Sequence, residues 1–157
     1  YVTARGPWYL VSWKGQREKS GGLMIDIGIH FFDMLLWLFG PAREAHVHLN
    51  EPRRAAGHLE LERATVKWFL SVAVEDLPFD AQPGVRTTYR AINVDGEEVE
   101  FSDGFADLHT RIYERTLAGN GFGIDDVRPA VQLVYQLRHA ALTPIDERSH
   151  PFAQRHR

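Results

Sequence analysis

Three ionisable side chains interrupt the most apolar stretch of this sequence, and their spacing is that of one helix face. Asp26, His30 and Asp33 stand at positions i, i+4 and i+7 within residues 23–39, so a helix would align all three along one stripe. Ionisable groups are seldom fully buried without a partner. The stripe therefore predicts that this otherwise apolar helix borders a cleft.

The chemistry that such a stripe favours is proton transfer. Histidine titrates closest to neutrality of all side chains, so His30 could accept a hydroxyl proton at working pH. Asp26 lies in the first helical turn, where the helix dipole favours a carboxylate. Two other interpretations fit the same residues. His30 could be a core histidine held by Asp26 or Asp33, or the three residues could bind a metal ion with His109 as a further ligand.

A glycine-rich basic loop leads directly into the start of this helix. It runs from Lys14 to Gly22 and holds Lys14, Arg17, Lys19 and the pair Gly21-Gly22, and Arg5 precedes it. Cations beside the free backbone N–H groups of a helix start can bind an anion. The loop therefore predicts an anion site, with a merely solvated loop as the alternative.

The elements around these residues follow from periodicity. Residues 23–39 are almost continuously apolar and end at Gly40-Pro41, which predicts one buried helix. After Pro41, apolar and polar residues alternate with a period of two, which predicts strands, and Asp95-Gly96 predicts a hairpin turn between two of them. Two helices are then predicted, at 108–117 and from Asp125 to about 142. The predicted strands are 45–49, 57–61, 65–74, 88–94 and 98–101. This order is typical of an α+β domain with a mostly antiparallel open sheet and helices packed on one face.

The strand at 65–74 is apolar on both alternations. Trp68, Leu70 and Val72 share one face, whereas Phe69 and Ala73 share the other. Both faces of the sheet should therefore be covered. We expect the face without helices to be used for oligomerisation, in a homodimer or homotetramer. The body of the domain is expected to be 1–146, followed by a polar, flexible tail at 147–157.

Composition excludes several classes of protein. The 157 residues suffice for one domain with a core, and the net charge of -3 comes from interspersed acids and bases. A nucleic-acid or membrane surface is therefore not expected. No cysteine is present, which excludes disulfides, thiolate zinc sites and cysteine nucleophiles. The charges within 23–39 argue against a membrane span, so we expect a cytoplasmic protein.

Several motifs resemble the Gfo/Idh/MocA oxidoreductases, and among them the UDP-N-acetyl-glucosaminuronate dehydrogenases. Two of these motifs are Arg-Gly-Pro-Trp-Tyr-Leu-Val-Ser-Trp-Lys-Gly at 5–15 and Asp-Ile-Gly-Ile-His-Phe-Phe-Asp at 26–33. Lys-Ser-Gly-Gly at 19–22 lies between them. Further similar segments are 57–71, 76–78, 104–110 and 121–128. The resemblance therefore extends over almost the whole chain.

The resemblance implies a fold, a reaction and a set of site residues. Residues 1–146 would be the C-terminal substrate-binding and oligomerisation domain. NAD or NADP would be bound by an N-terminal Rossmann domain, and the chain itself has no phosphate-binding glycine fingerprint. The reaction would oxidise the C3 hydroxyl of a UDP-sugar uronate for surface-polysaccharide biosynthesis. His30 would be the base, with Asp26 as its catalytic neighbour. The implied substrate-binding residues are Arg5, Trp13, Lys14, Lys19, Ser20, Gly21 and Gly22.

One departure bears on the substrate. The position of Asp26 is usually asparagine in that subgroup, and a carboxylate beside a uronate is repulsive unless cations offset it. The chain alone is expected to be inactive. A non-catalytic binding or assembly module remains the alternative function.

Overall fold

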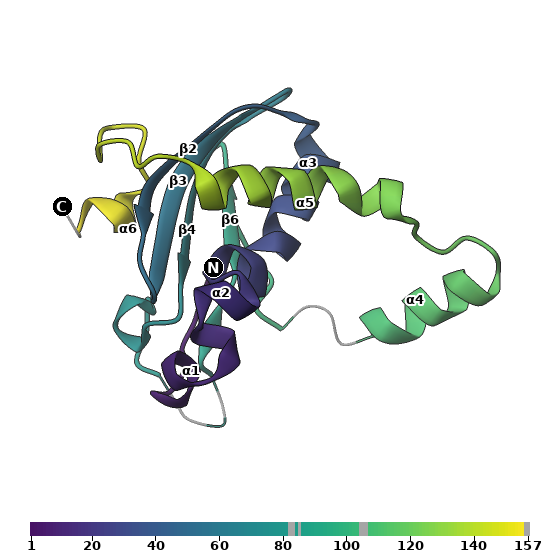
Figure 1. The fold of residues 1–157 in the computed structure, drawn as a ribbon, viewed down its shortest axis with the longest axis horizontal. Helices are drawn as coiled ribbons and strands as arrows, with labels where there is room; N and C mark the ends of the chain where they lie inside the picture. Colours follow the sequence, from purple (N-terminus) through teal and green to yellow (C-terminus); the bar gives the residue numbers. More distant parts are fainter. Residues whose placement is uncertain (82–83, 85, 104–106, 156–157) are drawn as a thin grey trace.

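An open sheet with two long helices on one face forms the body of this computed structural model, which describes residues 1–81, 84, 86–103 and 107–155 (Figure 1). Within those residues the main sheet has five strands in the order β2-β3-β4-β1-β5. Only the β1–β4 pair is parallel among them. The strands are β1 (Val2–Thr3), β2 (Ala42–Asn50), β3 (Arg54–Leu61), β4 (Thr65–Ser71) and β5 (Thr88–Tyr89). The predicted α+β class and mostly antiparallel open sheet are confirmed.

A separate hairpin pairs β6 (Ala91–Val94) with β7 (Glu97–Glu100). Its turn is Asp95-Gly96, and both residues have positive φ, 52° and 92°. This is the backbone that two-residue hairpin turns require, so the predicted turn is confirmed. The predicted strand at 88–94 is divided between β5 and β6.

The helical segments begin with three short turns. They are α1 (Trp8–Val11), the 3-10 turn η1 (Trp13–Gly15) and α2 (Arg17–Ser20). The predicted helix at 23–39 is present, but its first part, η2 (Met24–Gly28), winds as a π-helix before α3 (Ile29–Phe39). The others are η3 (Val74–Asp76), α4 (Leu108–Leu117), α5 (Ile124–His139) and α6 (Pro151–Gln154).

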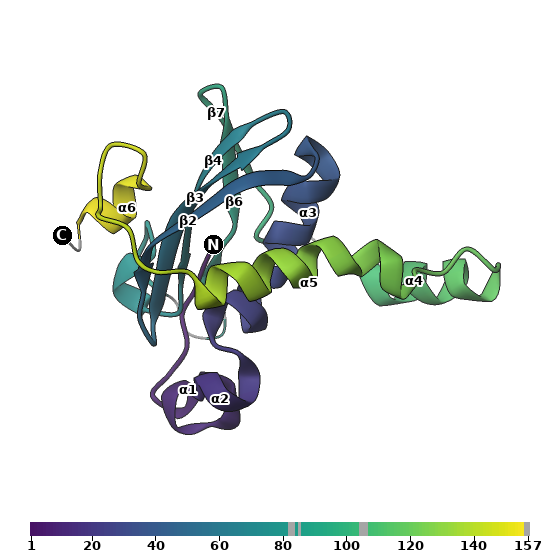
Figure 2. The ribbon, with the colours of Figure 1, turned by 45° about the horizontal axis from the view of Figure 1, so that its top comes forward.

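The main core lies between the sheet and the helices α3 and α5. Trp68 and Leu70 of β4 belong to it, as the alternation predicts, and the ring of Phe32 meets Trp68 edge to face at 5.2 Å. Leu133 and Leu137 of α5 belong to the same buried cluster. By contrast, α4 projects away from the sheet in both views (Figures 1 and 2), and none of its residues is buried. The prediction that helices pack on one face of the sheet is therefore confirmed for α3 and α5 but not for α4.

One described stretch, Arg17–Phe39, is long and apolar enough to cross a membrane by length and composition alone. The core helix of a globular domain passes the same test. Here the stretch is divided at Gly21-Gly22, and Phe32 and Leu35 pack into the core. We therefore interpret it as the core helix of the domain.

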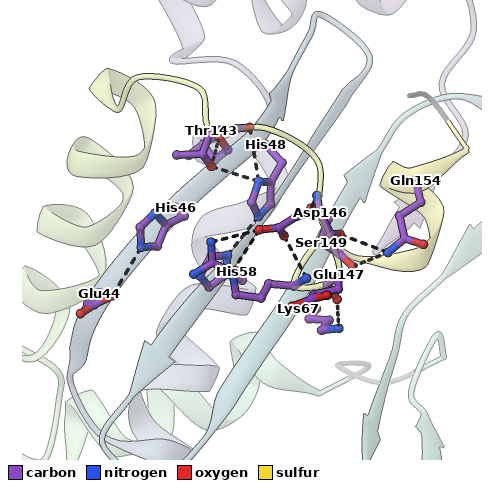
Figure 3. Close-up of polar contacts among 12 residues, drawn as sticks. Glu44, His46, His48, His58, Lys67, Thr143, Asp146, Glu147, Ser149 and Gln154 are labelled. Atoms are coloured by element: carbon purple, nitrogen blue, oxygen red, sulfur yellow. Dashed lines mark hydrogen bonds and ion pairs between the residues drawn. The ribbon is translucent and has the colours of Figure 1, made fainter.

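The other face of the sheet is covered in part by the chain itself, which corrects the expectation of a flexible tail at 147–157. The C-terminal segment, residues 142–155, crosses this outer face (Figure 3). Ala153 is fully buried in one cluster with Phe69. Phe69 packs against the rings of His150 and Phe152, with centroids 5.6 and 5.5 Å away. The segment expected as a flexible tail is thus packed as far as residue 155, and 156–157 lie outside the described residues. Phe69 needs no second subunit to cover it.

Candidate active site

The stripe of ionisable residues lies on the side of the helix away from the sheet. His30 and Asp33 are exposed, and Asp26 is half-buried. Trp37, one turn beyond Asp33, extends the same face and is 81% exposed. The helix predicted as buried therefore buries only its sheet-facing side. Its outer face is accessible to a ligand.

Asp26 lies within the π-helical turn. The turn also contains Gly28, where an added Cβ would approach Leu70 Cδ1 to 2.7 Å, so the helix backbone passes very close to the sheet. Single π turns inside α-helices occur frequently at functional sites. The turn changes the orientation of Asp26 relative to a regular α-helix, in which i and i+4 residues are aligned.

Asp26 is held by a tyrosine that the sequence did not single out. The buried Tyr9 donates its hydroxyl proton to Asp26 Oδ2 at 3.0 Å. Burial raises the pKa of Tyr9 above its usual range, the Asp26 carboxylate raises it further, and the charge of Arg5 opposes both. The hydroxyl therefore stays a donor. The structure thus brings Tyr9 and Asp26 together, within reach of the charge of Arg5 on Tyr9, and the only sequence signal for Tyr9 was the aromatic run that contains it.

His30 is not oriented by either aspartate. It forms no hydrogen bond with any part of the chain that the structure describes, and Asp26 bonds to Tyr9 instead. The alternative of a core histidine held by Asp26 or Asp33 is therefore wrong.

The metal alternative finds no support either. Across residues 1–81, 84, 86–103 and 107–155, no three His, Asp or Glu side chains are placed to hold an ion. His109, the suggested extra ligand, lies on the projecting helix α4.

The basic loop is held in one conformation by its own side chains. Ser20 Oγ donates to the carbonyl of Lys14 at 2.6 Å and accepts from the amide of Gly22 at 2.9 Å. Gly21 and Gly22 have φ values of 88° and 76°, which side chains with a Cβ rarely adopt. The ammonium of Lys14 lies 5.9 Å from the ring centroid of Trp13, which is 59% exposed.

Lys19, in contrast, is exposed on α2 beside this loop. Ser20, Gly21 and Gly22 therefore shape the loop, and Trp13, Lys14 and Lys19 are the side chains available to a ligand.

Comparison with known proteins identifies the family. Residues 1–79 match the C-terminal alpha/beta domain of the Gfo/Idh/MocA oxidoreductase family. The chain belongs to this family. The resemblance seen in the motifs of the sequence is confirmed. A shorter match, 46% identical over 39 residues, joins 25% of this chain to 10% of an uncharacterized oxidoreductase of Synechocystis sp..

Two solved structures of the WlbA (WbpB) dehydrogenase from Thermus thermophilus contain the fold of this chain over nearly its whole length. One, in complex with NAD and alpha-ketoglutarate, is 52% identical with a TM-score of 0.89. The other, in complex with NAD and UDP-GlcNAcA, is 51% identical with a TM-score of 0.88. Each comparison covers 96% of this chain and 49% of the WlbA chain. The chain therefore spans about half the length of these relatives.

Proposed function

We propose that this chain is the substrate-side domain of an NAD(P)-dependent dehydrogenase that oxidises the C3 hydroxyl of a UDP-sugar uronate. The observation that carries the proposal is the exposed helix face with His30, next to the hydrogen-bonded pair of Tyr9 and Asp26. The sequence of this chain is 51–52% identical to that of WlbA, which was crystallised with NAD and UDP-GlcNAcA, and this similarity supports the same substrate class. Surface-polysaccharide biosynthesis, in the cytoplasm, is the process we propose for it, with neither nucleic acid nor membrane as a partner.

In this proposal His30 is the general base. Its imidazole is accessible and free of intramolecular hydrogen bonds within the described residues, so a substrate hydroxyl can donate to it and transfer its proton. A bound nicotinamide would take up the hydride from the same carbon. We assign no cofactor-binding residue to this chain, and expect NAD or NADP to be held mainly by the part of the enzyme outside it.

Asp26 would orient the sugar from the same side. Its Oδ2 is fixed by Tyr9, which leaves Oδ1 to accept a hydrogen bond from a sugar hydroxyl. The positive charge of Arg5 acts on Tyr9, the partner of Asp26, and would offset the repulsion between Asp26 and a uronate.

The basic loop would supply further substrate contacts. Lys14 and Lys19 can pair with anionic groups, and the exposed ring of Trp13 can stack on a sugar or base. Ser20, Gly21 and Gly22 would contribute by fixing the loop beside the helix start.

The test is replacement of His30 in the complete dehydrogenase, assayed with UDP-GlcNAcA and NAD. His30→Asn should lower turnover by roughly 10²–10⁴-fold, the range for a lost general base. His109→Asn, on the projecting helix α4, is the matched control and should leave turnover unchanged. Turnover of His30→Asn within a few-fold of the wild type would overturn the proposal and favour a binding module. The 157-residue chain alone should show no turnover.

A further inference from the structure

Helix α4 is amphipathic, but nothing within the described residues covers its apolar side. Its large apolar residues are all exposed, and none of its ten residues is buried; they are Leu108, Ile112, Tyr113 and Leu117. The charged residues of α4 fall together on the opposite side of the helix. Helices shorter than about 12–15 residues are only marginally stable in water by themselves. The apolar side of α4 therefore requires a partner.

Helix α5 carries a second uncovered stripe. Val127, Val131 and Tyr135 follow one another at i, i+4 and i+8, and Ile124 stands one turn before them. All four side chains are exposed, whereas residues on the sheet-facing side, such as Leu133, are buried in the core. Soluble monomers seldom expose a continuous row of large apolar side chains. Two apolar stripes without a partner therefore lie on consecutive helices.

The connection between α4 and α5 holds these two stripes apart. The guanidinium carbon of Arg115 lies 4.8 Å from the ring centroid of Phe122, so the connection packs on the end of α4. Gly119 has a φ of 79°, which turns the chain there. Figure 1 accordingly shows α4 apart from α5. A connection of this length can join two helices packed as a hairpin, yet here the α5 stripe is left open to a second α4.

Charge also favours contact between α4 of one copy and α5 of another. Arg111 and Arg115 stand on α4, and Asp125 and Asp126 stand in the first turn of α5. Neither arginine forms an ion pair with a carboxylate of the described residues. Opposite charges on the two helices therefore attract when two copies approach.

We propose that α4 and the exposed stripe of α5 form a reciprocal interface between two copies of this chain, in which α4 of each copy packs on α5 of the other. A second copy is the occupant because the chain itself supplies the apolar helix that complements the α5 stripe. Exchange of one helix about a two-fold axis makes both contacts at once. Residues 108–135 match the roughly 20–30 residues that each partner contributes to a stable interface. This interface is separate from the outer sheet face and independent of the function proposed for His30.

The experiment is sedimentation velocity of the 157-residue chain across the micromolar range, with hydrogen exchange of the amides of residues 108–117 measured in parallel. Association should rise with concentration, and exchange in α4 should slow with it, because α4 alone is a marginal helix. Ile112→Asp and Val131→Lys should each weaken association about tenfold or more, since each places an unpaired charge in the interface. Glu114→Ala, on the charged side of α4, is the matched control and should associate as the wild type does. Pairing through the outer sheet face would persist in all these variants.

A mixture of the two variants tests the exchange of helices directly. The Ile112→Asp chain keeps an intact α5 stripe, and the Val131→Lys chain keeps an intact α4. A mixed pair therefore has one native contact and one contact between opposite charges. The mixture should associate more tightly than either variant alone.

Three outcomes would overturn the proposal. They are wild-type association of Ile112→Asp, a mixture that associates no more tightly than its components, and a monomer at every concentration. A monomer with slow exchange at 108–117 would show that α4 packs on α5 of its own chain. A monomer with fast exchange there would show that another part of the complete enzyme covers α4. Neither substitution replaces a buried residue, so both variants should fold, which thermal unfolding checks.

Discussion

The hydroxyl of Tyr9 and the carboxylate of Asp26 are joined by a 3.0 Å hydrogen bond across 17 positions of sequence. The bond attaches the short helix α1 to the π turn at the start of the core helix. Because Tyr9 is buried, it has little freedom to move, and it holds Asp26 at a fixed orientation on the outer helix face.

Removing that hydroxyl should cost both stability and orientation. Tyr9→Phe should lower the free energy of unfolding by roughly 1.5–3 kcal/mol, the contribution of a hydrogen bond to a charged group. Chemical denaturation of the chain measures the change. Tyr113→Phe on α4, where the ring is 69% exposed, is the control and should be neutral. A neutral Tyr9→Phe would show that Asp26 is held in another way.

The packing of the C-terminal segment should make stability depend on pH. Burial lowers the pKa of His150 to about 4, helped by the nearby charges of Lys67 and Arg155. Its Nδ1 accepts a hydrogen bond from the amide of Phe152 at 3.1 Å, which requires that nitrogen to be unprotonated. Between pH 6.5 and 4 the unfolded chain therefore binds more protons at this residue than the folded chain does, so stability falls as the pH falls.

The size of this effect is at most about 1.4 kcal/mol for each pH unit crossed. Above pH 6.5 His150 is neutral in both states, so no stability is lost through it. Below about pH 4 the loss of stability no longer grows. Denaturation curves at several pH values measure it, and His150→Gln should flatten the slope. His58 contributes to the pH dependence of stability in both the wild type and the His150→Gln variant. Burial and the neighbouring His46 and His48 lower the pKa of His58 as well. A variant slope equal to that of the wild type would contradict the assignment to His150.

Two glycines should differ sharply in their tolerance of alanine. At Gly57 an added Cβ would lie 2.0 Å from the backbone oxygen of His46, which the β2–β3 pairing holds in place. Gly57→Ala should therefore destabilise the chain by more than about 4 kcal/mol. At Gly28 the nearest atoms are side-chain ends of Leu70 and Phe32, which can shift, so Gly28→Ala should cost about 1–3 kcal/mol. Thermal unfolding ranks the two, and the reverse order would contradict this explanation.

Self-association remains a prediction for this chain. Part of the outer sheet face lies beyond the C-terminal segment, with His46 and Glu60 along it, and the resemblance to the family implies pairing through this sheet. Light scattering at micromolar concentration should therefore give a homodimer or homotetramer. Because this area is polar, we expect the assembly to weaken at high salt. A monomer at every concentration would contradict the prediction.

Periodicity predicted the parts of the fold that obey one simple repeat. Residues of β4 alternate between the two faces, so Trp68 and Phe69 were assigned to their correct sides from the sequence. The accessible position of His30 was anticipated because an ionisable residue in an apolar helix is conspicuous. Tyr9 was missed because its contact with Asp26 depends on an irregular segment that approaches the helix only in the folded chain. The C-terminal segment was missed because its polar composition conceals a few well-placed apolar side chains.

The π turn at Met24–Gly28 amounts to one residue more than a regular helix needs. A π turn takes up its extra residue without changing the phase of the helix on either side, so deleting one residue there would let the segment rewind as an α-helix with the basic loop and His30 still in register. The side chains within the turn, Asp26 among them, would shift along the helix face instead. A comparison of such length variants would therefore show how far substrate choice depends on the position of this one carboxylate.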